Sequence, residues 1–540
     1  MSEGDPGHAP TDPAPTPDEA PDEAPDEAPG EAPGEARDEA PDEADPGQAS
    51  DQPGDPPPER PQRRTGRWLR RTTAALVVLV LLAAVATYRF DLVSRWLGNG
   101  HPSPVTAPAL VLPPAGLTLP TPPRAAPVAA ATPERAVDGA AVRRAVGPLL
   151  RSKKLGPHVV VEVARLSDGE IVYRHGTGPV TPASTMKMLT TVAALSALGP
   201  AHRFTTSVVA TRHARRVVLV GGGDPLLGRA PAPAGTYPAR ADLTTLARAT
   251  AAALRRAGRH RIRLGYDASL FTGPAVNPRW EPSYVPDNVV SPISALWVDE
   301  GREPTNPTQR SPAPAAAAAD LFAHAVERNH LTVVGTPTRA VAPPRSAGGR
   351  AVAAVRSAPL AEIVQHVLEV SDNEGAEVLD RQVALARGEP ASFVGGARAV
   401  RAVLRQLGIS TRGARIYDGS GLSRQDRLEA STMLAVIRAA AGSRHPDLRS
   451  AVANLPVAGF TGSLARRFQT GDPGGLGTVR AKTGTLSGVH GLAGIATSTD
   501  GVVMSFVAVA DHVKPVDTLD ARSQLDRVAA ALGGCTCARR

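Results

Sequence analysis

Three short motifs contain the side chains of this sequence with the clearest chemical potential. Ser184-Thr185-Met186-Lys187 places a hydroxyl and an amine three positions apart, Ser371-Asp372-Asn373 follows, and Lys482-Thr483-Gly484-Thr485 comes near the end. This set, in this order, is typical of serine enzymes that open amide bonds through an acyl-enzyme. Each motif alone is weak, since Ser-Asp-Asn by itself favours a helix cap or a turn. Their combination predicts one shared active site.

The use of lysine supports this interpretation. The chain has five lysines and fifty-five arginines, and two of the five lysines, Lys187 and Lys482, lie within the motifs. An arginine stays protonated at any workable pH. A site that needs an amine able to give and take a proton must therefore keep lysine.

The expected roles follow from what amide hydrolysis requires. Lys187, one helical turn from Ser184, is expected to remove the hydroxyl proton once burial and a second cation lower its pKa. Lys482 is the candidate for that cation. We expect Ser371 to pass the proton to the leaving amine, and Asn373 to orient Lys187 and the substrate backbone. We expect no metal and no cofactor at this site.

The third motif is predicted to form a strand that binds substrate. Its backbone can pair with an extended peptide, and Thr483 together with the Lys482 cation would receive a terminal carboxylate. We assign Gly484 and Thr485 to the same substrate-binding segment. The backbone amides of Ser184 and Thr485 are the candidates for an oxyanion hole.

Local patterns predict the elements that position these residues. Apolar residues at helical spacing after Pro182 predict a helix over Thr185–Leu198 that ends at Gly199-Pro200. Asp168-Gly169 is expected to turn a hairpin between two strands. Further predicted helices and strands are Val142–Leu150, Val159–Ala164, Glu170–Tyr173, Val217–Val220, Arg261–Gly265, Leu360–Val370, Gly375–Ala386, Gly491–Ala496 and Val502–Ala510. The fold class is therefore α/β.

The first part of the chain differs in composition from the rest. Residues 1–59 hold nineteen acidic residues and one basic residue, with proline at short intervals, so we predict that residues 1–66 form a disordered acidic Pro/Glu/Ala-rich tail. Residues 67–92 contain an uncharged apolar run with arginines before it. This pattern predicts a transmembrane signal anchor with a cytoplasmic N-terminus and an extracellular catalytic body. Cleavage near Ala86 would instead release a secreted protein.

The remaining chain is predicted to contain a spacer and one divided catalytic domain. Residues 93–135 are rich in proline and alanine and are expected to form an extended linker. The catalytic domain is predicted over 136–204 and 355–534. The intervening segment, 205–354, lacks catalytic signals and is predicted to hold smaller inserted domains.

Charge and cysteine content limit the possible partners. From Thr72 onward the chain carries 53 basic and 33 acidic residues, a net charge of +20. A basic surface outside a bacterial membrane suits an anionic cell wall, and nucleic acid is not expected there. Cys535 and Cys537, the two cysteines, are separated by one residue, so we expect neither a structural disulfide nor a zinc site from them.

The motifs resemble those of the class C low-molecular-mass penicillin-binding proteins, the D-alanyl-D-alanine carboxypeptidases and endopeptidases of peptidase family S13. Three further segments resemble accessory signatures of that family: Val220–Pro225, Tyr417–Ser423 and Leu455–Gly459. The resemblance implies a β-lactamase-like transpeptidase domain with inserted domains. It also implies trimming of peptidoglycan stem peptides and covalent inhibition by β-lactams. By motif, Ser184 is the nucleophile, and its partners are Lys187, Ser371, Asn373 and Lys482.

Two other functions remain open from the residues alone. A class A β-lactamase shares the three motifs but places the second much nearer the first, whereas 187 positions separate Ser184 from Ser371 here. A non-catalytic penicillin-binding or wall-sensing protein on the same fold would explain the basic exterior, the spacer and the anchor. It would not explain the complete set of reactive residues.

Overall fold

The structure, a computed structural model of the whole chain, describes residues 135–211, 215–303, 305–469 and 473–539. The predicted tail (1–66) and anchor (67–92), and all but the last residue of the predicted linker, lie outside these residues. None of the helices within the described ranges has the length and apolar character needed to cross a bilayer.

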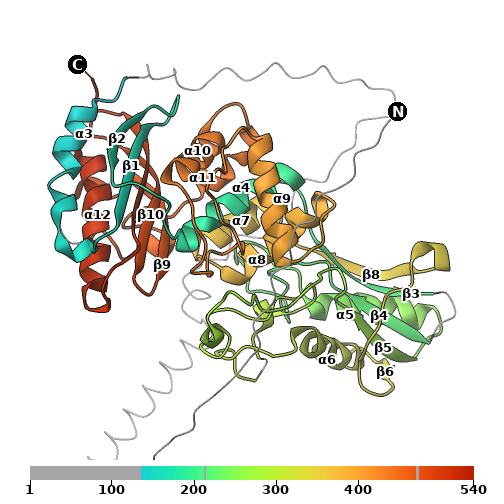
Figure 1. Cartoon of the computed structure of the whole chain (residues 1–540). Coiled ribbons are helices and arrows are strands. Elements are labelled where there is room, and N and C mark those ends of the chain that lie inside the picture. Colours follow the sequence, from blue (N-terminus) through green and yellow to red (C-terminus); the bar gives the residue numbers. More distant parts are fainter. Residues whose placement is uncertain (1–134, 212–214, 304, 470–472, 540) are drawn as a thin grey trace, which may run out of the picture. The chain divides into compact units, whose positions relative to one another are not determined.

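Five antiparallel strands form the central sheet, in the spatial order β2-β1-β11-β10-β9 (Figure 1). Their bounds are β1 (Val159–Arg165), β2 (Ile171–His175), β9 (Val479–Leu486), β10 (Val489–Thr497) and β11 (Val503–Ala510). The hairpin predicted around Asp168-Gly169 is confirmed, since β1 pairs with β2. The middle strand β11 is buried from Met504 to Ala510. Layers on both faces explain why its sequence is almost entirely apolar.

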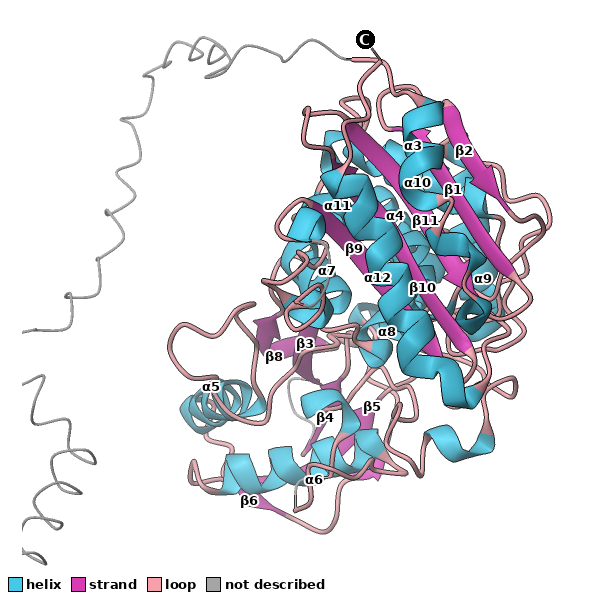
Figure 2. Ribbon diagram, turned by 90° about the vertical axis from the view of Figure 1, so that its left-hand side faces the viewer, coloured by secondary structure: helices cyan, strands magenta, loops and turns pink. Residues whose placement is uncertain are grey.

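Helices cover both faces of this sheet, as Figure 2 also shows. One face carries α3 (Gly139–Val146) and α12 (Thr518–Gly534). The other face carries α4 (Met186–Leu198), α7 (Leu360–Glu369), α8 (Asn373–Ala386), α9 (Phe393–Gln406), α10 (Ala430–Ala441) and α11 (Ser450–Ala453). The helix predicted over Val142–Leu150 starts earlier and ends at Val146, because Pro148 lacks the N–H that would continue it.

Helix α4 is the centre of the second helical layer. All ten residues from Met186 to Leu195 are buried, because α7, α8, α9 and α10 all contact this helix. A helix enclosed in this way is apolar all round rather than along one stripe. The predicted helix over Thr185–Leu198 is thus confirmed, except that Thr185 belongs to a short 3-10 turn before it.

A second, mixed sheet is formed by the chain between α4 and α7. Its main path is β6-β5-β4-β3-β8, and β7 also pairs with β5. The strands are β3 (Thr205–Ala210), β4 (Arg216–Val220), β5 (Arg261–Asp267), β6 (Thr332–Val333), β7 (Thr338–Arg339) and β8 (Arg350–Arg356). Two helices, α5 (Leu243–Arg256) and α6 (Pro314–Glu327), share an apolar core with this sheet. The chain therefore has a mixed α/β fold.

The C-terminal cysteines depart from the sequence prediction. Cys535 and Cys537 form a disulfide, so the expectation of no disulfide was wrong. The chain is extended at Cys535 and the two Cα atoms are 5.4 Å apart, a separation that a disulfide spans readily. The backbone of Asp138 donates to the Cys537 carbonyl at 2.8 Å, which ties the C-terminal segment to the start of α3.

Candidate active site

Ser184 lies in a tight turn at the start of α4. The 3-10 turn Ala183–Thr185 leads directly into the helix, and Ala183 has a left-handed φ of 47°. The turn is packed against Gly421, where a Cβ atom would lie 1.9 Å from the Ala183 carbonyl oxygen. Only glycine permits this approach, and its own φ of +81° is also a glycine conformation. Ser184 itself is half-buried, so its hydroxyl remains reachable.

The Lys187 ammonium is fully buried and points at this hydroxyl. Its Nζ donates to Ser184 Oγ at 2.9 Å, to Asn373 Oδ1 at 2.7 Å and to the Ser420 carbonyl at 2.9 Å. Burial lowers the pKa of Lys187 to about 8, although nearby carboxylates such as Asp372 oppose this shift. An amine with this pKa is neutral often enough near pH 7 to accept a proton from a hydroxyl.

Asn373 is the first residue of α8, and both polar atoms of its side-chain amide are hydrogen-bonded. Its Oδ1 accepts from Lys187, and its Nδ2 donates to the Val289 carbonyl at 2.9 Å. The Asp372 side chain caps α8 by accepting from the Gly375 amide at 2.8 Å. The helix-cap interpretation of the Ser-Asp-Asn motif is therefore correct for Asp372, and the same cap fixes the residues on either side of it.

Lys482 and Ser371 form a second hydrogen-bonded pair in the site. Lys482 Nζ donates to Ser371 Oγ at 2.8 Å and to the Thr483 carbonyl at 2.9 Å. The Thr483 hydroxyl in turn donates to Ser463 Oγ at 3.1 Å. The pKa of Lys482 lies well below its usual value, first because of burial and then because of the positive charges of Lys187 and Arg467.

Strand β9 runs beside the serine turn at the edge of the sheet. A Cβ at Gly484 would lie 2.8 Å from the Pro182 carbonyl oxygen, so glycine is needed for the strand to lie this close. The first half of the outer edge is paired with the segment around Val457. Among the described residues, no backbone partner covers the outer edge of Thr483–Leu486. Thr485 is exposed there, and an extended peptide can add to such an edge.

The structure thus brings the sequence-predicted residues into one hydrogen-bonded site. Ser184, Lys187 and Asn373 form one hydrogen-bonded group, and Ser371 and Lys482 form a second beside it. Thr483 and Gly484 follow Lys482 on β9. Their individual catalytic roles stay predictions.

Sequence reasoning missed the backbone groups that complete this site. The carbonyls of Ser420 and Val289 hold the Lys187 amine and the Asn373 amide. Ser420 belongs to Tyr417–Ser423, a segment that resembles an accessory signature of the family, and Glu377 fixes this loop by accepting from the Ser420 amide at 2.8 Å. Residue type carries no signal for a carbonyl contact, so only the loop could be anticipated.

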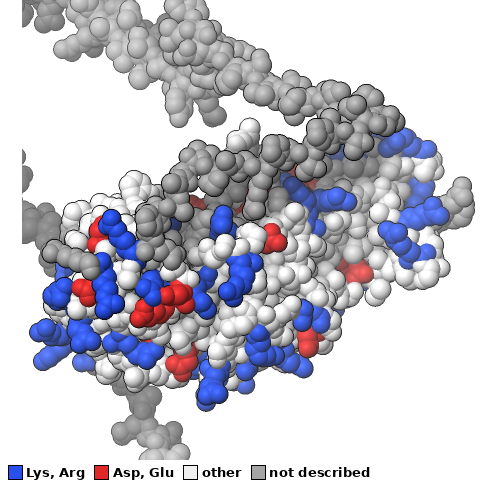
Figure 3. Space-filling view, turned by 90° about the horizontal axis from the view of Figure 1, so that it is seen from above, with Lys and Arg blue, Asp and Glu red and all other residues white. Residues whose placement is uncertain are grey.

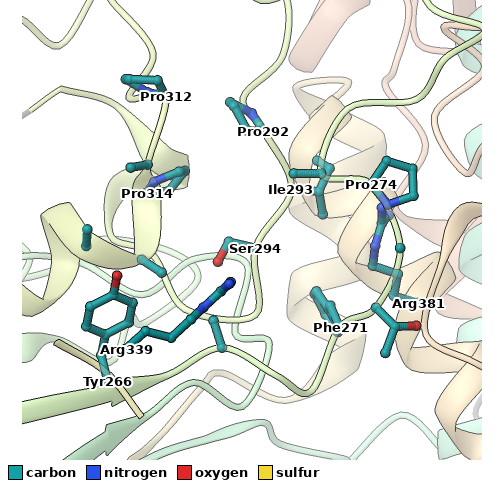
Figure 4. Close-up of a pocket in the computed structure, with 17 residues that line it drawn as sticks. Tyr266, Phe271, Pro274, Pro292, Ile293, Ser294, Pro312, Pro314, Arg339 and Arg381 are labelled. Atoms are coloured by element: carbon teal, nitrogen blue, oxygen red, sulfur yellow. The ribbon is translucent and has the colours of Figure 1, made fainter. Parts of the chain in front are cut away.

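A separate cavity of about 290 Å³ lies where α8 meets the segment between α4 and α7 (Figure 4). Arg381 of α8 and Arg339 of β7 line it from different sides, with Phe271 and Ser294 between them. None of its lining residues belongs to the three motifs. The cavity is therefore distinct from the serine site.

Comparison with known proteins places these findings in a family context. The sequence model described as "D-Ala-D-Ala carboxypeptidase 3 (S13) family" matches residues 143–312 and 301–532. Carboxypeptidase DacB from Mycolicibacterium smegmatis is 36% identical over 488 residues, which cover 88% of this chain and 99% of that relative.

Solved structures show the same fold. A crystal structure of penicillin binding protein 4 (dacB) from Haemophilus influenzae matches with a TM-score of 0.57 and 21% identity, covering 72% of this chain and 98% of that chain. The same protein complexed with a β-lactam matches with a TM-score of 0.53 and 22% identity, covering 70% and 98%. At this level of identity, the likeness concerns the fold alone.

Proposed function

Because the chain belongs to the D-Ala-D-Ala carboxypeptidase 3 (S13) family, we propose that it removes the terminal D-alanine of peptidoglycan stem peptides through an acyl-enzyme on Ser184. It is a serine-type hydrolase of the carboxypeptidase class. The observation that carries the mechanism is the 2.9 Å hydrogen bond from the buried, pKa-lowered Lys187 amine to the Ser184 hydroxyl.

Acylation begins with neutral Lys187 accepting the hydroxyl proton of Ser184. The Ser184 oxygen adds to the carbonyl carbon of the penultimate D-alanine, and the carbonyl oxygen becomes an oxyanion. The backbone amides of Ser184 and Thr485 stabilise that negative charge as it develops. The terminal carboxylate of the substrate binds to Thr483 and to Lys482, and its negative charge favours the protonated form of that buried amine.

Departure of D-alanine requires a proton on its nitrogen. Ser371, which accepts from Lys482 Nζ at 2.8 Å, supplies this proton and is reprotonated through the lysines. The bond between the carbonyl carbon and nitrogen then breaks, which leaves an ester on Ser184. Water hydrolyses the ester with Lys187 as the base, and the free hydroxyl is restored.

Covalent inhibition by β-lactams follows from the same steps. A β-lactam amide acylates the serine, but its nitrogen stays tethered to the acyl group and obstructs the approach of water. The β-lactam complex of the Haemophilus influenzae protein supports this proposal. The non-catalytic alternative is not favoured, because the carboxypeptidase family match extends over both the Ser184 and the Lys482 motifs.

The cellular setting is a further part of the proposal. Residues 67–92 would anchor the chain, with the acidic tail in the cytoplasm and the enzyme outside, next to the cell wall. Lys and Arg side chains outnumber Asp and Glu on the face drawn in Figure 3, which suits an anionic polymer. The catalytic domain would comprise 136–204 and 355–534, with 205–354 as inserted domains. Cleavage near Ala86 would give a secreted enzyme instead.

The test is release of D-alanine from a peptide that ends in D-Ala-D-Ala. The full chain should release D-alanine, Ser184→Ala should lose the activity, and Ser167→Ala should keep it, because Ser167 is an exposed serine outside the site. Equal rates for the parent and Ser184→Ala would contradict the mechanism. A cross-linked dimeric muropeptide as second substrate measures whether cross-links are also cleaved.

A further inference from the structure

A second cluster of chemically capable side chains lies directly behind the Ser371–Asn373 turn. Glu300 comes from a turn in the segment between β5 and α6, His366 from the last turn of α7, and Asp372 from the start of α8. His366 Nε2 is 3.8 Å from Glu300 Oε1 and 3.9 Å from Asp372 Oδ2. One ligand atom from each of the three residues lies within 4.8 Å of the other two.

Asp372 leaves one oxygen of this cluster without a partner. Its Oδ1 accepts from the Gly375 amide, but its Oδ2 is buried and has no hydrogen-bond partner among the described residues. The side chain is only 3% exposed. A buried polar atom without a partner destabilises the folded state, so this oxygen is suited to a ligand.

Two of the neighbouring arginines, Arg302 and Arg310, are already paired with other oxygens. Arg302 donates to Glu300 Oε2 at 3.0 Å, which leaves Oε1 for the cluster. Arg310 forms a buried ion pair with Glu374 at 2.9 Å. A cation in the cluster would therefore face two carboxylate oxygens and an imidazole nitrogen.

We propose that Glu300, His366 and Asp372 bind a zinc ion. Zinc prefers imidazole nitrogen and carboxylate oxygen at about 2.0–2.2 Å, which puts tetrahedral ligand atoms roughly 3.3 Å apart. The observed separations of 3.8 and 3.9 Å reach that value with side-chain shifts of less than about 1 Å. A cavity of about 450 Å³, which Glu300 and His366 line, gives access and supplies water as the remaining ligand.

Bound zinc would join three separate elements beside the catalytic turn. The loop carrying Glu300, the end of α7 and the start of α8 would share one ion, and Asp372 lies between Ser371 and Asn373. The ion would thus stabilise the turn that presents these two residues. The zinc site is therefore structural, and the ion takes no part in the acyl transfer.

Another histidine–carboxylate cluster in the described part of the chain provides the contrast. In the cluster of His158, Asp511 and His512, both Asp511 oxygens already have partners: Oδ1 pairs with His158 Nδ1, and Oδ2 accepts from the Thr181 amide at 2.8 Å. No carboxylate oxygen of Asp511 is left for a metal. His512 is therefore a matched control for His366.

The test uses the full chain, stripped with a chelator and then titrated with zinc alone. Elemental analysis after gel filtration should find one zinc per chain, and cobalt substitution should give the visible absorption of a site with nitrogen and oxygen ligands. His366→Gln and Glu300→Gln should each weaken zinc binding at least about 100-fold, because loss of even an outer-shell partner costs about 10–100-fold and these residues are direct ligands. His512→Gln should bind as the parent does.

Thermal unfolding separates a lost ligand from a lost fold. Zinc should raise the Tm of the parent and of His512→Gln but not that of His366→Gln, provided the variant unfolds cooperatively. If His366→Gln fails to fold, Glu300→Gln gives the same comparison, since a glutamine can still accept from Arg302. No zinc retained by the parent, or zinc retained equally by His366→Gln and Glu300→Gln, would overturn the proposal.

Discussion

Replacing Lys187 by arginine tests whether this residue is the base that activates Ser184. The guanidinium keeps the positive charge and can still donate to Ser184, Asn373 and Ser420, but its pKa above 12 prevents deprotonation. With the lysine pKa at about 8, the Lys187 amine is neutral in roughly half of the parent molecules at pH 8. In the arginine variant, the guanidinium is neutral in about one molecule in ten thousand or fewer. Acylation should therefore slow by about 10³–10⁴-fold, within the range for a general base.

The assay is the rate of acylation by a fluorescent penicillin between pH 6 and pH 10. For the parent, the rate should rise about tenfold per pH unit up to about pH 8 and then level off, because the neutral amine is the active form. Lys514→Arg, at an exposed lysine, should follow the parent profile. A rate for Lys187→Arg within tenfold of the parent, or a parent profile that is flat below pH 8, would refute this reasoning.

Three further changes test the site and its support. Ser371→Ala should slow D-alanine release about 10²-fold or more, and an unchanged rate would exclude Ser371 from proton transfer. Burial raises the pKa of Asp224 to about 7, so its carboxylate destabilises the folded state increasingly as pH rises from about 4 to 7. Asp224→Asn should then increase the free energy of urea unfolding by about 1.5 kcal/mol at pH 5 and about 4 kcal/mol at pH 8, and an equal gain at both pH values would contradict the burial argument. Gly421→Ala should lower stability by more than about 3 kcal/mol in the same assay, because its Cβ meets the Ala183 carbonyl oxygen, whereas Gly413→Ala, with only its positive φ to accommodate, should cost about 1 kcal/mol.

Local sequence patterns were sufficient to predict the helix that follows Ser184 and the strand that carries Lys482. Both elements are set by spacing over a few residues: the apolar run after Pro182, and the threonine and glycine around Lys482. The order of the motifs then predicted that Asn373 and Lys187, 186 positions apart, would meet, and they lie 2.7 Å apart. The family resemblance supplied that long-range pairing, since spacing alone cannot.

Contacts that depend on tertiary packing could not be predicted in this way. The carbonyls of Val289 and Ser420 reach the site because loops converge there, and every residue type has a carbonyl. Glu300 and His366 approach Asp372 from different elements, so no local spacing indicates their cluster. The disulfide of the C-terminal cysteines depends on an extended backbone after α12, which the sequence does not reveal.

Mass spectrometry of the penicillin-treated full chain tests the central claim most directly. The parent should carry one penicilloyl adduct per chain, located by peptide mapping on Ser184, and Ser184→Ala should carry none. An adduct on any other residue, an adduct that persists in Ser184→Ala, or no adduct on the parent would contradict the acyl-enzyme mechanism.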